Sequence, residues 1–208
     1  HARAEEHFLR ALELRQAALG NSNSEVSNTI AWLGLIKQVS GNLAEAEDYY
    51  LRALEIRAST FGQDHPYTMN SYLSLAVLQF IQGNYQGARE YLETVLDYYH
   101  NAFGEDHPAT GGIKTILAAT LFLLGDHEQG RIIAEESLVT AIRNDLPDFL
   151  WMSQFVYSLI LNAQGHSEAA ILFGKQAVNS LQSMRQGIAD MEEGLQRSFI
   201  GDKAEVYR

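Results

Sequence analysis

Hydrophobic residues recur every three or four positions along most of the chain, which is the spacing of one face of an α-helix. Glycines interrupt this pattern every 42 residues in two series, Gly41, Gly83 and Gly125, and Gly20, Gly62 and Gly104, with Gly165 following 40 residues after Gly125. The pattern predicts pairs of antiparallel helices. The first helix of each pair is predicted at 24–39, 66–82, 108–124 and 148–164, and the second at 2–19, 43–60, 85–102, 127–144 and 167–184.

The residues of the helices repeat as well as their spacing. The second helices read AEEHFLRALELR at 4–15, AEDYYLRALEIR at 46–57 and AREYLETVLDYY at 88–99. Self-similarity at a fixed period is typical of a solenoid, in which each unit buries its apolar face only by stacking on its neighbours. Small residues at fixed places let the two helix backbones of a pair approach closely. They are Gly34, Ala76, Ala118 and Ser158 in the first helices, and Ala46, Ala88, Gly130 and Ala170 in the second.

An Asp-His-Pro loop occurs twice, in FGQDHPYT at 61–68 and in FGEDHPAT at 103–110. Asp and His together are found in metal sites and in acid/base dyads. The period offers a simpler interpretation, because the two copies occupy matching positions in successive units. The proline suits the first turn of a helix, and the carboxylates of Asp64 and Asp106 would lie near its N-terminus, where the helix dipole favours negative charge. We interpret the loop as a structural connection and keep the metal site as the alternative.

Composition narrows the classes of function. Of 208 residues, 46% are hydrophobic and 20% are charged, which is typical of a globular chain. The net charge of −11 and the lack of a basic cluster argue against nucleic acid and anionic membrane surfaces as partners. No apolar run is long enough to span a bilayer, and the sequence does not open with a signal peptide. The absence of cysteine excludes a cysteine nucleophile from this segment and fits a reducing compartment, so we expect a cytoplasmic location.

Candidate catalytic and metal-binding residues are sparse. The histidines outside the repeated loop fall in different units, without the spacing of two metal ligands on one helical face. Adjacent acids such as Glu135 and Glu136 point apart on a helix, which is typical of a solvated face rather than of an acid/base pair. We therefore expect no metal, no cofactor and no catalytic residue in this segment, while a Ser-His-Asp arrangement stays open from sequence alone.

The order of large and small residues, the glycines and the repeated loop resemble tetratricopeptide repeats of the 42-residue kinesin-light-chain type. The resemblance is most complete in GNLAEAEDYYLRALEIRASTFGQDHPYT at 41–68, covers residues 2–183, and weakens where RNDLPDFL replaces the Asp-His-Pro loop. It implies an all-α fold, namely a right-handed α-solenoid of about four and a half repeats followed by a C-terminal helix. It also implies that the first helices line a concave peptide-binding groove, and it implies no catalysis.

One position departs from the kinesin-light-chain pattern. These proteins typically carry an asparagine before the leucine of the first helix, and that asparagine holds the backbone of a bound peptide. The corresponding residues here are Trp32, Ser74, Ile116 and Val156. The implied architecture therefore transfers to this chain, whereas the cargo-binding chemistry does not.

The lining of the implied groove is almost uncharged. The segment PYTMNSYLSLAVLQFIQ at 66–82 has no charged residue, and the next first helix has only Lys114. The groove-facing positions implied by the resemblance are Asn28, Trp32, Leu35, Asn70, Leu73, Ser74, Val77, Thr115, Ile116, Phe122, Phe155 and Leu159. Because Lys and Arg are nearly absent from them, we expect no carboxylate clamp and predict an apolar, uncharged peptide or helix as the ligand. The alternative is that tight curvature buries some of these side chains as core.

The two ends of the chain differ from the repeats between them. We expect the solenoid at residues 1–183 and capping or linker helices at 184–208. The first predicted helix lacks its hairpin partner, so Phe8 and Leu12 lack a packing partner on that side. This arrangement suggests a piece of a longer protein or an end that is available for self-association.

After Leu181 the period of 42 ends. Apolar residues at three- or four-residue spacing predict one more helix at 186–200, and Gly201-Asp202 suggests that it stops there. The phrase LQRSF, followed by DKAEVYR, resembles the segment that joins tetratricopeptide repeats to a CHAT domain, a caspase-like cysteine peptidase fold, in bacterial proteins. This resemblance implies that the chain is the recognition or regulatory arm of a larger protein whose peptidase lies beyond residue 208.

The sequence leaves three classes of function open. The first is a non-catalytic scaffold that binds a protein or peptide segment in its groove, and we predict this one. The second is a structural module that forms a homo-oligomer through its terminal helices. The third is an enzyme with its site in the groove, to which no residue pattern points.

Overall fold

The computed structural model describes the backbone of residues 2–206 and the side chains of residues 3–191. Over that backbone the secondary structure is helical, without a strand. The helices are α1 (Ala2–Leu19), α2 (Ser24–Val39), α3 (Leu43–Phe61), α4 (Pro66–Ile81), α5 (Tyr85–Phe103), α6 (Pro108–Leu123), α7 (His127–Arg143), α8 (Pro147–Ala163) and α9 (Ser167–Val206). The first eight begin and end within one residue of the predicted helices, which confirms the all-α prediction. Between residues 2 and 206, none of these helices has the length and hydropathy of a membrane-spanning segment.

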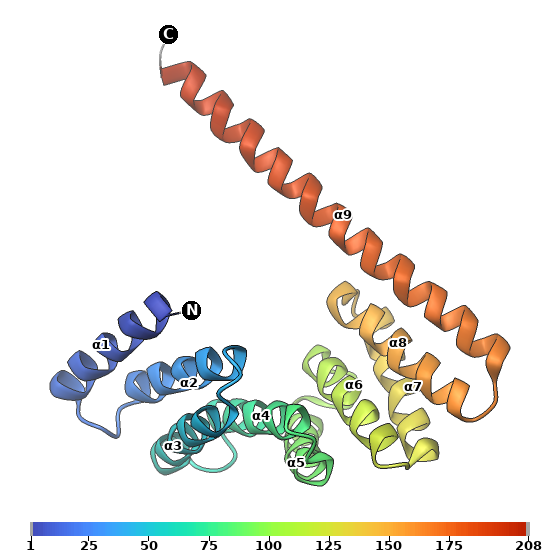
Figure 1. The fold of residues 1–208 in the computed structure, drawn as a ribbon, viewed down its shortest axis with the longest axis horizontal. Helices are drawn as coiled ribbons and strands as arrows, with labels where there is room; N and C mark the ends of the chain where they lie inside the picture. The colour runs from blue at the N-terminus through green and yellow to red at the C-terminus, as the bar shows by residue number, and fades with distance from the viewer. Residues whose placement is uncertain (1, 207–208) are drawn as a thin grey trace.

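The helices form a curved row of antiparallel hairpins (Figure 1). The main contacts run between consecutive helices, from α1 with α2 to α8 with α9. In addition, α6 lies directly against both α4 and α8. Direct contact between even-numbered helices places them together on one side of the row, with α3, α5 and α7 on the other. This arrangement is the α-solenoid that the period predicts.

The glycines of the two periodic series share one backbone conformation. All seven have a positive φ, between +79° and +93°, a region that residues with a side chain rarely adopt. Gly62 and Gly104 end α3 and α5, and their N–H groups donate to the carbonyl oxygens of Ala58 and His100 at 3.0 Å. The interval that predicts the helix pairs therefore marks the points where the chain needs a left-handed residue.

In the repeated loop, histidine caps the helix that follows. Nδ1 of His65 accepts a hydrogen bond from the N–H of Tyr67, and Nδ1 of His107 accepts one from the N–H of Ala109, each at 3.2 Å. An N-terminal cap satisfies one of the N–H groups that has no partner within the helix. The proline that follows each histidine has no N–H to satisfy. The Asp-His-Pro loop is therefore a helix start.

Aromatic stacking fixes the same two histidines. The His65 ring lies 4.5 Å from the ring of Phe61, and the His107 ring lies 4.7 Å from the ring of Phe103, measured between centroids. The prediction that the neighbouring aspartates serve the helix start is wrong for Asp106, because its carboxylate pairs with Arg143 of α7. The sequence did not separate these roles because Asp is the commoner capping residue.

The large-small pattern sets the distance between the helices of a hairpin. Leu33, Leu75 and Leu117 are buried, and burying one leucine contributes about 1.5–3 kcal/mol to folding. Beside Leu33, Gly34 of α2 lies against Tyr50 of α3, and a Cβ atom added at Gly34 would lie 2.7 Å from that ring. The small residues therefore permit the close packing that the sequence predicts.

A buried cluster of three hydroxyl groups joins α6, α7 and α8. The oxygen of Thr115 lies 2.7 Å from that of Ser137 and 3.0 Å from that of Ser153, and the two serine oxygens are 2.8 Å apart. Both Thr115 and Ser153 also donate to the carbonyl oxygen four residues earlier in their own helices. Buried polar groups are costly unless they are hydrogen-bonded, so this cluster stabilises one arrangement of the three helices.

The last helix differs from the prediction. We expected a break after residue 184, a separate helix at 186–200 and a stop at Gly201-Asp202, but α9 runs as one helix of 40 residues. No proline follows Pro147 and Gly187 has no positive φ, so the helical hydrogen bonds continue. Its first part packs on α8, and the remainder projects away from the hairpins (Figure 1).

Two further expectations concern the end of the chain. The boundary between 1–183 and 184–208 falls inside α9 and stays a prediction. Leu195 and the LQRSF–DKAEVYR phrase have side chains outside the described residues. Ile188 and Met191 are exposed on α9.

Replacement of Gly34 by alanine tests the close packing. The new methyl group meets Tyr50, so we expect Gly34→Ala to lower the free energy of unfolding by about 1–3 kcal/mol. Gly174→Ala is the matched control, because a Cβ atom there lies 3.8 Å from its nearest neighbour and alanine favours a helix by about 0.5–1 kcal/mol. Urea denaturation followed by circular dichroism measures both. Equal midpoints for the two variants would contradict the account of hairpin packing.

Candidate functional site: the inner face of the solenoid

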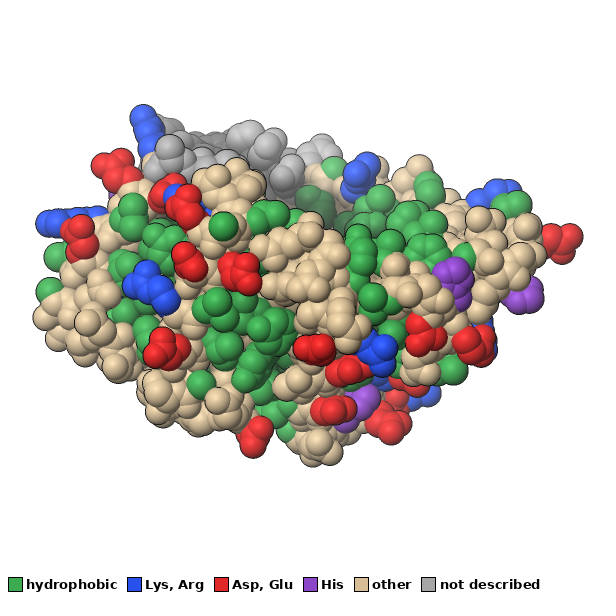
Figure 2. Space-filling view, turned by 60° about the horizontal axis from the view of Figure 1, so that its bottom comes forward, with side chains coloured by type: hydrophobic (Ala, Val, Ile, Leu, Met, Phe, Trp, Pro, Cys, Tyr) green, Lys and Arg blue, Asp and Glu red, His purple; other side chains and the backbone are tan. Residues whose placement is uncertain are grey.

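We call the surface formed by α2, α4, α6 and α8 the groove. It carries few charges, since α4 has none, α6 has only Lys114 and α8 has only Asp148. Lys114 is buried, and its Nζ lies 3.1 Å from Oε2 of Glu136 on α7, so its charge is already paired. On the face of the molecule shown in Figure 2, by contrast, acidic side chains are spread between hydrophobic patches.

An apolar pocket of about 410 Å³ lies between α4, α6 and α8. It is lined by Val77, Phe80, Thr115, Ile116, Ala119, Phe122, Leu123, Trp151, Met152, Phe155, Val156 and Leu159. Phe155 exposes 49% of its surface and Leu159 exposes 38%. Exposed aromatic and aliphatic side chains around a concavity are typical of a binding surface.

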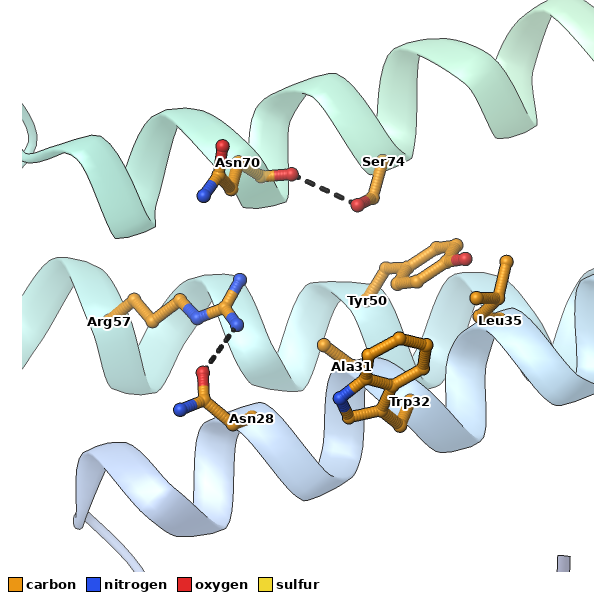
Figure 3. Close-up of a pocket in the computed structure, with 8 residues that line it drawn as sticks. All are labelled: Asn28, Ala31, Trp32, Leu35, Tyr50, Arg57, Asn70 and Ser74. Carbon is orange, nitrogen blue, oxygen red and sulfur yellow. Dashed lines mark hydrogen bonds between the residues drawn. The ribbon is translucent and has the colours of Figure 1, made fainter. Parts of the chain in front are cut away.

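A polar pocket of about 260 Å³ lies between α2, α3 and α4 (Figure 3). It is lined by Asn28, Ala31, Trp32, Leu35, Tyr50, Arg57, Asn70 and Ser74. Trp32 is 53% exposed, and its ring stacks on Phe8 of α1 at 6.1 Å between centroids. The hydroxyl of Tyr50 donates to Oε1 of Gln38 at 3.0 Å, and burial raises the pKa of Tyr50 to about 12. The tyrosine is therefore neutral at physiological pH.

Arg57 lies at the floor of the polar pocket and is 7% exposed. Its Nη2 donates to Oδ1 of Asn28 at 2.9 Å, and its Nη1 donates to Oγ of Ser71 at 2.8 Å. Longer hydrogen bonds of 3.3 Å connect Nε to Oγ of Ser27 and Nη1 to the carbonyl oxygen of Tyr67. Burial lowers the pKa of the guanidinium from its ordinary value. The side chain thus connects α2, α3 and α4 through neutral groups.

The presence of Arg57 corrects the expectation that the groove lacks basic side chains. It comes from a second helix, α3, and reaches the pocket between two first helices, which a reading of the first helices alone could not reveal. The signal was the repeated phrase ALELR and ALEIR, in which Arg15 and Arg57 hold equivalent positions. Arg15 makes the equivalent bond one unit earlier, from Nη1 to Oγ1 of Thr29 at 2.6 Å.

The predicted groove positions fall into the two pockets with one exception. The polar pocket contains Asn28, Trp32, Leu35, Asn70 and Ser74, and the apolar pocket contains Val77, Thr115, Ile116, Phe122, Phe155 and Leu159. Leu73 packs instead against the main core, half-buried. Thr115 is also a correction, because its hydroxyl belongs to the buried cluster and offers no bond to a ligand.

Several lining residues were not predicted as groove positions. They are Ala31, Tyr50 and Arg57 in the polar pocket, and Phe80, Ala119, Leu123, Trp151, Met152 and Val156 in the apolar pocket. Most lie one or three positions along a helix from a predicted residue, so a finer reading of helical periodicity would have found them. Among the described side chains, no group of three or more His, Asp or Glu residues is placed to hold a metal ion.

Solved structures share this fold. BtubC (BKLC) from P. vanneervenii has a TM-score of 0.75 at 19% identity, over 88% of this chain and 74% of that protein. A Podosopora anserina protein of nearly identical TPR-like repeats of the kinesin light chain kind has a TM-score of 0.71 at 19% identity, over 88% of both chains. MamA has a TM-score of 0.60 at 16% identity, over 88% of this chain and 94% of MamA. At these identities the likeness shows the fold alone.

Comparison of the sequence itself gives a narrower result. No curated protein matches it. The family model for the tetratricopeptide repeat matches residues 25–100 and 75–138, which together make up more than half of the chain. Matched repeats, helix hairpins of the predicted period and the shared fold agree, and the chain belongs to the tetratricopeptide repeat family.

Proposed function

We propose that the chain is a non-catalytic interaction scaffold that binds an apolar segment of a partner protein in its groove. Tetratricopeptide repeats generally mediate protein–protein interaction. The observation that supports the proposal most strongly is the apolar pocket, where Phe155 and Leu159 are exposed on helices that carry almost no charge.

Energetics favour an apolar ligand at this pocket. Covering one exposed aromatic or leucine side chain contributes about 1.5–3 kcal/mol, and aromatic residues commonly supply most of the binding energy of an interface. A charged ligand group would lose its hydration there without gaining a partner, since the charge of Lys114 is already paired with Glu136. An amphipathic helix or an extended peptide with apolar side chains fits both conditions.

The two pockets lie along one helix. Asn70 and Ser74 of α4 line the polar pocket, and Val77 of the same helix, one turn further on, lines the apolar pocket. Positions 70, 74 and 77 share one face of a helix. A bound segment that follows α4 therefore passes both pockets, and the predicted groove residues in the two pockets form one proposed site.

We further propose that this scaffold is the recognition or regulatory arm of a larger, cytoplasmic bacterial protein of the CHAT type. The support is the LQRSF–DKAEVYR phrase alone. The reading frame of the parent gene beyond Arg208 tests it. A caspase-like domain with paired His and Cys residues is expected there, and a frame that encodes no such domain would contradict this part of the proposal.

Self-association is the second candidate function, and one observation on α9 favours it. Val178 holds the position that Leu54 has in α3 and Leu96 has in α5, 13 residues after the glycine that precedes each helix. Leu96 is buried and Leu54 is packed in the core, whereas Val178 is 54% exposed. An apolar position that is covered in other units is therefore uncovered at this end of the row.

Disruption of the apolar pocket tests the main proposal. We expect the wild-type chain to select peptides rich in Leu, Ile, Phe or Trp from a displayed library of short random peptides. Phe155→Asp should weaken the selected peptides by at least about tenfold, because a charge replaces an anchoring ring. Ile142→Asp is the control, since Ile142 is 62% exposed on α7, outside both pockets. Equal losses in both variants would contradict the assignment.

The two tryptophans report on the pockets separately. Trp151 lines the apolar pocket and Trp32 lines the polar pocket. In a Trp32→Phe variant, a selected peptide should shift the emission of Trp151 to shorter wavelength, because the peptide excludes water from the ring. An unchanged spectrum on saturation would show that the peptide binds elsewhere.

Light scattering separates the second candidate from the first. If the uncovered end of α9 is an oligomer interface, the mass in solution rises with concentration, and Val178→Asp returns it to that of the monomer. A mass of one chain at every concentration would exclude self-association.

A further inference from the structure

We propose that the polar pocket is a carboxylate-binding subsite, in which Arg57 pairs with the side chain of an acidic residue in the bound segment. This inference rests on the proposed function, because it supposes that a protein segment occupies the groove. It refines that function, since the partner then carries an acidic residue beside the apolar residues that enter the apolar pocket.

Arg57 differs from the other basic side chains of residues 3–191 in having no carboxylate partner. The other buried or half-buried cations each have one within 3.5 Å: Arg15–Glu25, Lys37–Glu45, Arg89–Glu93, Lys114–Glu136 and Arg131–Glu135. None of the described ion pairs includes Arg57, although it is among the most buried of these cations. A buried charge is costly unless it is paired, so an anion that reaches Arg57 gains more there than at an exposed arginine.

The guanidinium retains the capacity to bind a carboxylate. It has five N–H donors, and its four hydrogen bonds go to neutral oxygen acceptors of Asn28, Ser71, Ser27 and Tyr67. These bonds orient the group and leave its charge in place. A carboxylate adds a charge-assisted hydrogen bond, which is stronger than a bond between neutral groups.

Two asparagines flank the guanidinium. Asn28 of α2 and Asn70 of α4 lie on opposite sides of Arg57, and both line the pocket (Figure 3). An amide NH₂ group donates to a carboxylate, so Asn70 supplies a second donor from the opposite wall. No Asp or Glu lines this pocket, although the chain as a whole carries a net charge of −11. The pocket is therefore a local exception that an acidic group can enter without repulsion from its lining.

The depth of Arg57 favours a side chain over a chain terminus. Arg57 exposes 7% of its surface, whereas Trp32 at the rim exposes 53%. A carboxylate on a flexible stem reaches the floor while its methylene groups lie against the indole ring of Trp32. The backbone of the segment then stays at the level of the rim and continues along α4 to the apolar pocket.

Three small probes test the subsite directly. N-acetylglutamate amide presents a side-chain carboxylate, N-acetylglutamine amide is its neutral isostere, and N-acetylglycine presents a terminal carboxylate. We follow the Nε–H signal of Arg57 and the indole N–H signal of Trp32 by ¹⁵N NMR, with Arg52 on the exposed side of α3 as the internal reference. The proposal predicts a saturable shift of the first two signals with the glutamate probe, and affinity at least about tenfold lower for both other probes.

Variants separate binding from folding. Arg57→Gln should abolish the shift of the Trp32 signal. If Arg57→Gln does not fold, Asn70→Leu serves instead, because Asn70 makes none of the hydrogen bonds that hold Arg57, and it should weaken the glutamate probe by at least about tenfold. Ile142→Asp, outside the pocket, should bind the probe like the wild type.

Three results would overturn the inference. They are the absence of a saturable shift, equal binding of the glutamate and glutamine probes, and tighter binding of N-acetylglycine, which would assign the pocket to a chain terminus. The probes are too short to reach the apolar pocket. Failure of this subsite is therefore distinguishable from failure of the apolar proposal, which the Phe155→Asp selection measures.

Discussion

Each helix hairpin of this chain buries its apolar residues only by stacking on the next hairpin, and the other features of the molecule depend on that stacking. The main core cluster shows it directly, because it contains Met69, Leu92, Leu121, Ile133 and Ile160 from five consecutive helices. Close approach needs small residues where helices meet, as at Gly34, and left-handed glycines where the chain reverses. The inner face of the even-numbered helices is not consumed by this packing. Its apolar residues therefore stay available to another molecule.

The two pockets follow from the same geometry. Each lies where neighbouring inner helices meet, so its chemistry is set by the side chains that those helices present and by what reaches between them. Between α4, α6 and α8, apolar and aromatic side chains fill the inner positions, and the hydroxyl of Thr115 is turned into the core. Between α2 and α4, Arg57 reaches through from α3 and makes the pocket polar. One scaffold thus presents two different chemical surfaces along a single face of α4.

Local signals explain why most of the fold was predictable from the sequence. Periodic glycines and the prolines of the repeated loop act on the backbone within a few residues, so helix ends followed from them to within one residue. Helical register likewise predicted most groove positions. The errors involve interactions between elements: Thr115 is buried by serines on α7 and α8, and the basic group of the groove arrives from a second helix. The continuous α9 was missed because the end of a repeat pattern is not a signal for the end of a helix.

The central claim is that the uncharged inner face, rather than any other surface, holds a segment of another protein. Intermolecular nuclear Overhauser effects between methyl groups and a peptide selected by this chain measure that most directly. The account predicts contacts from the peptide to the methyl groups of Val77, Ile116 and Leu159, which line the apolar pocket. Contacts confined to Val139 and Ile142, exposed on the outer helix α7, would contradict it.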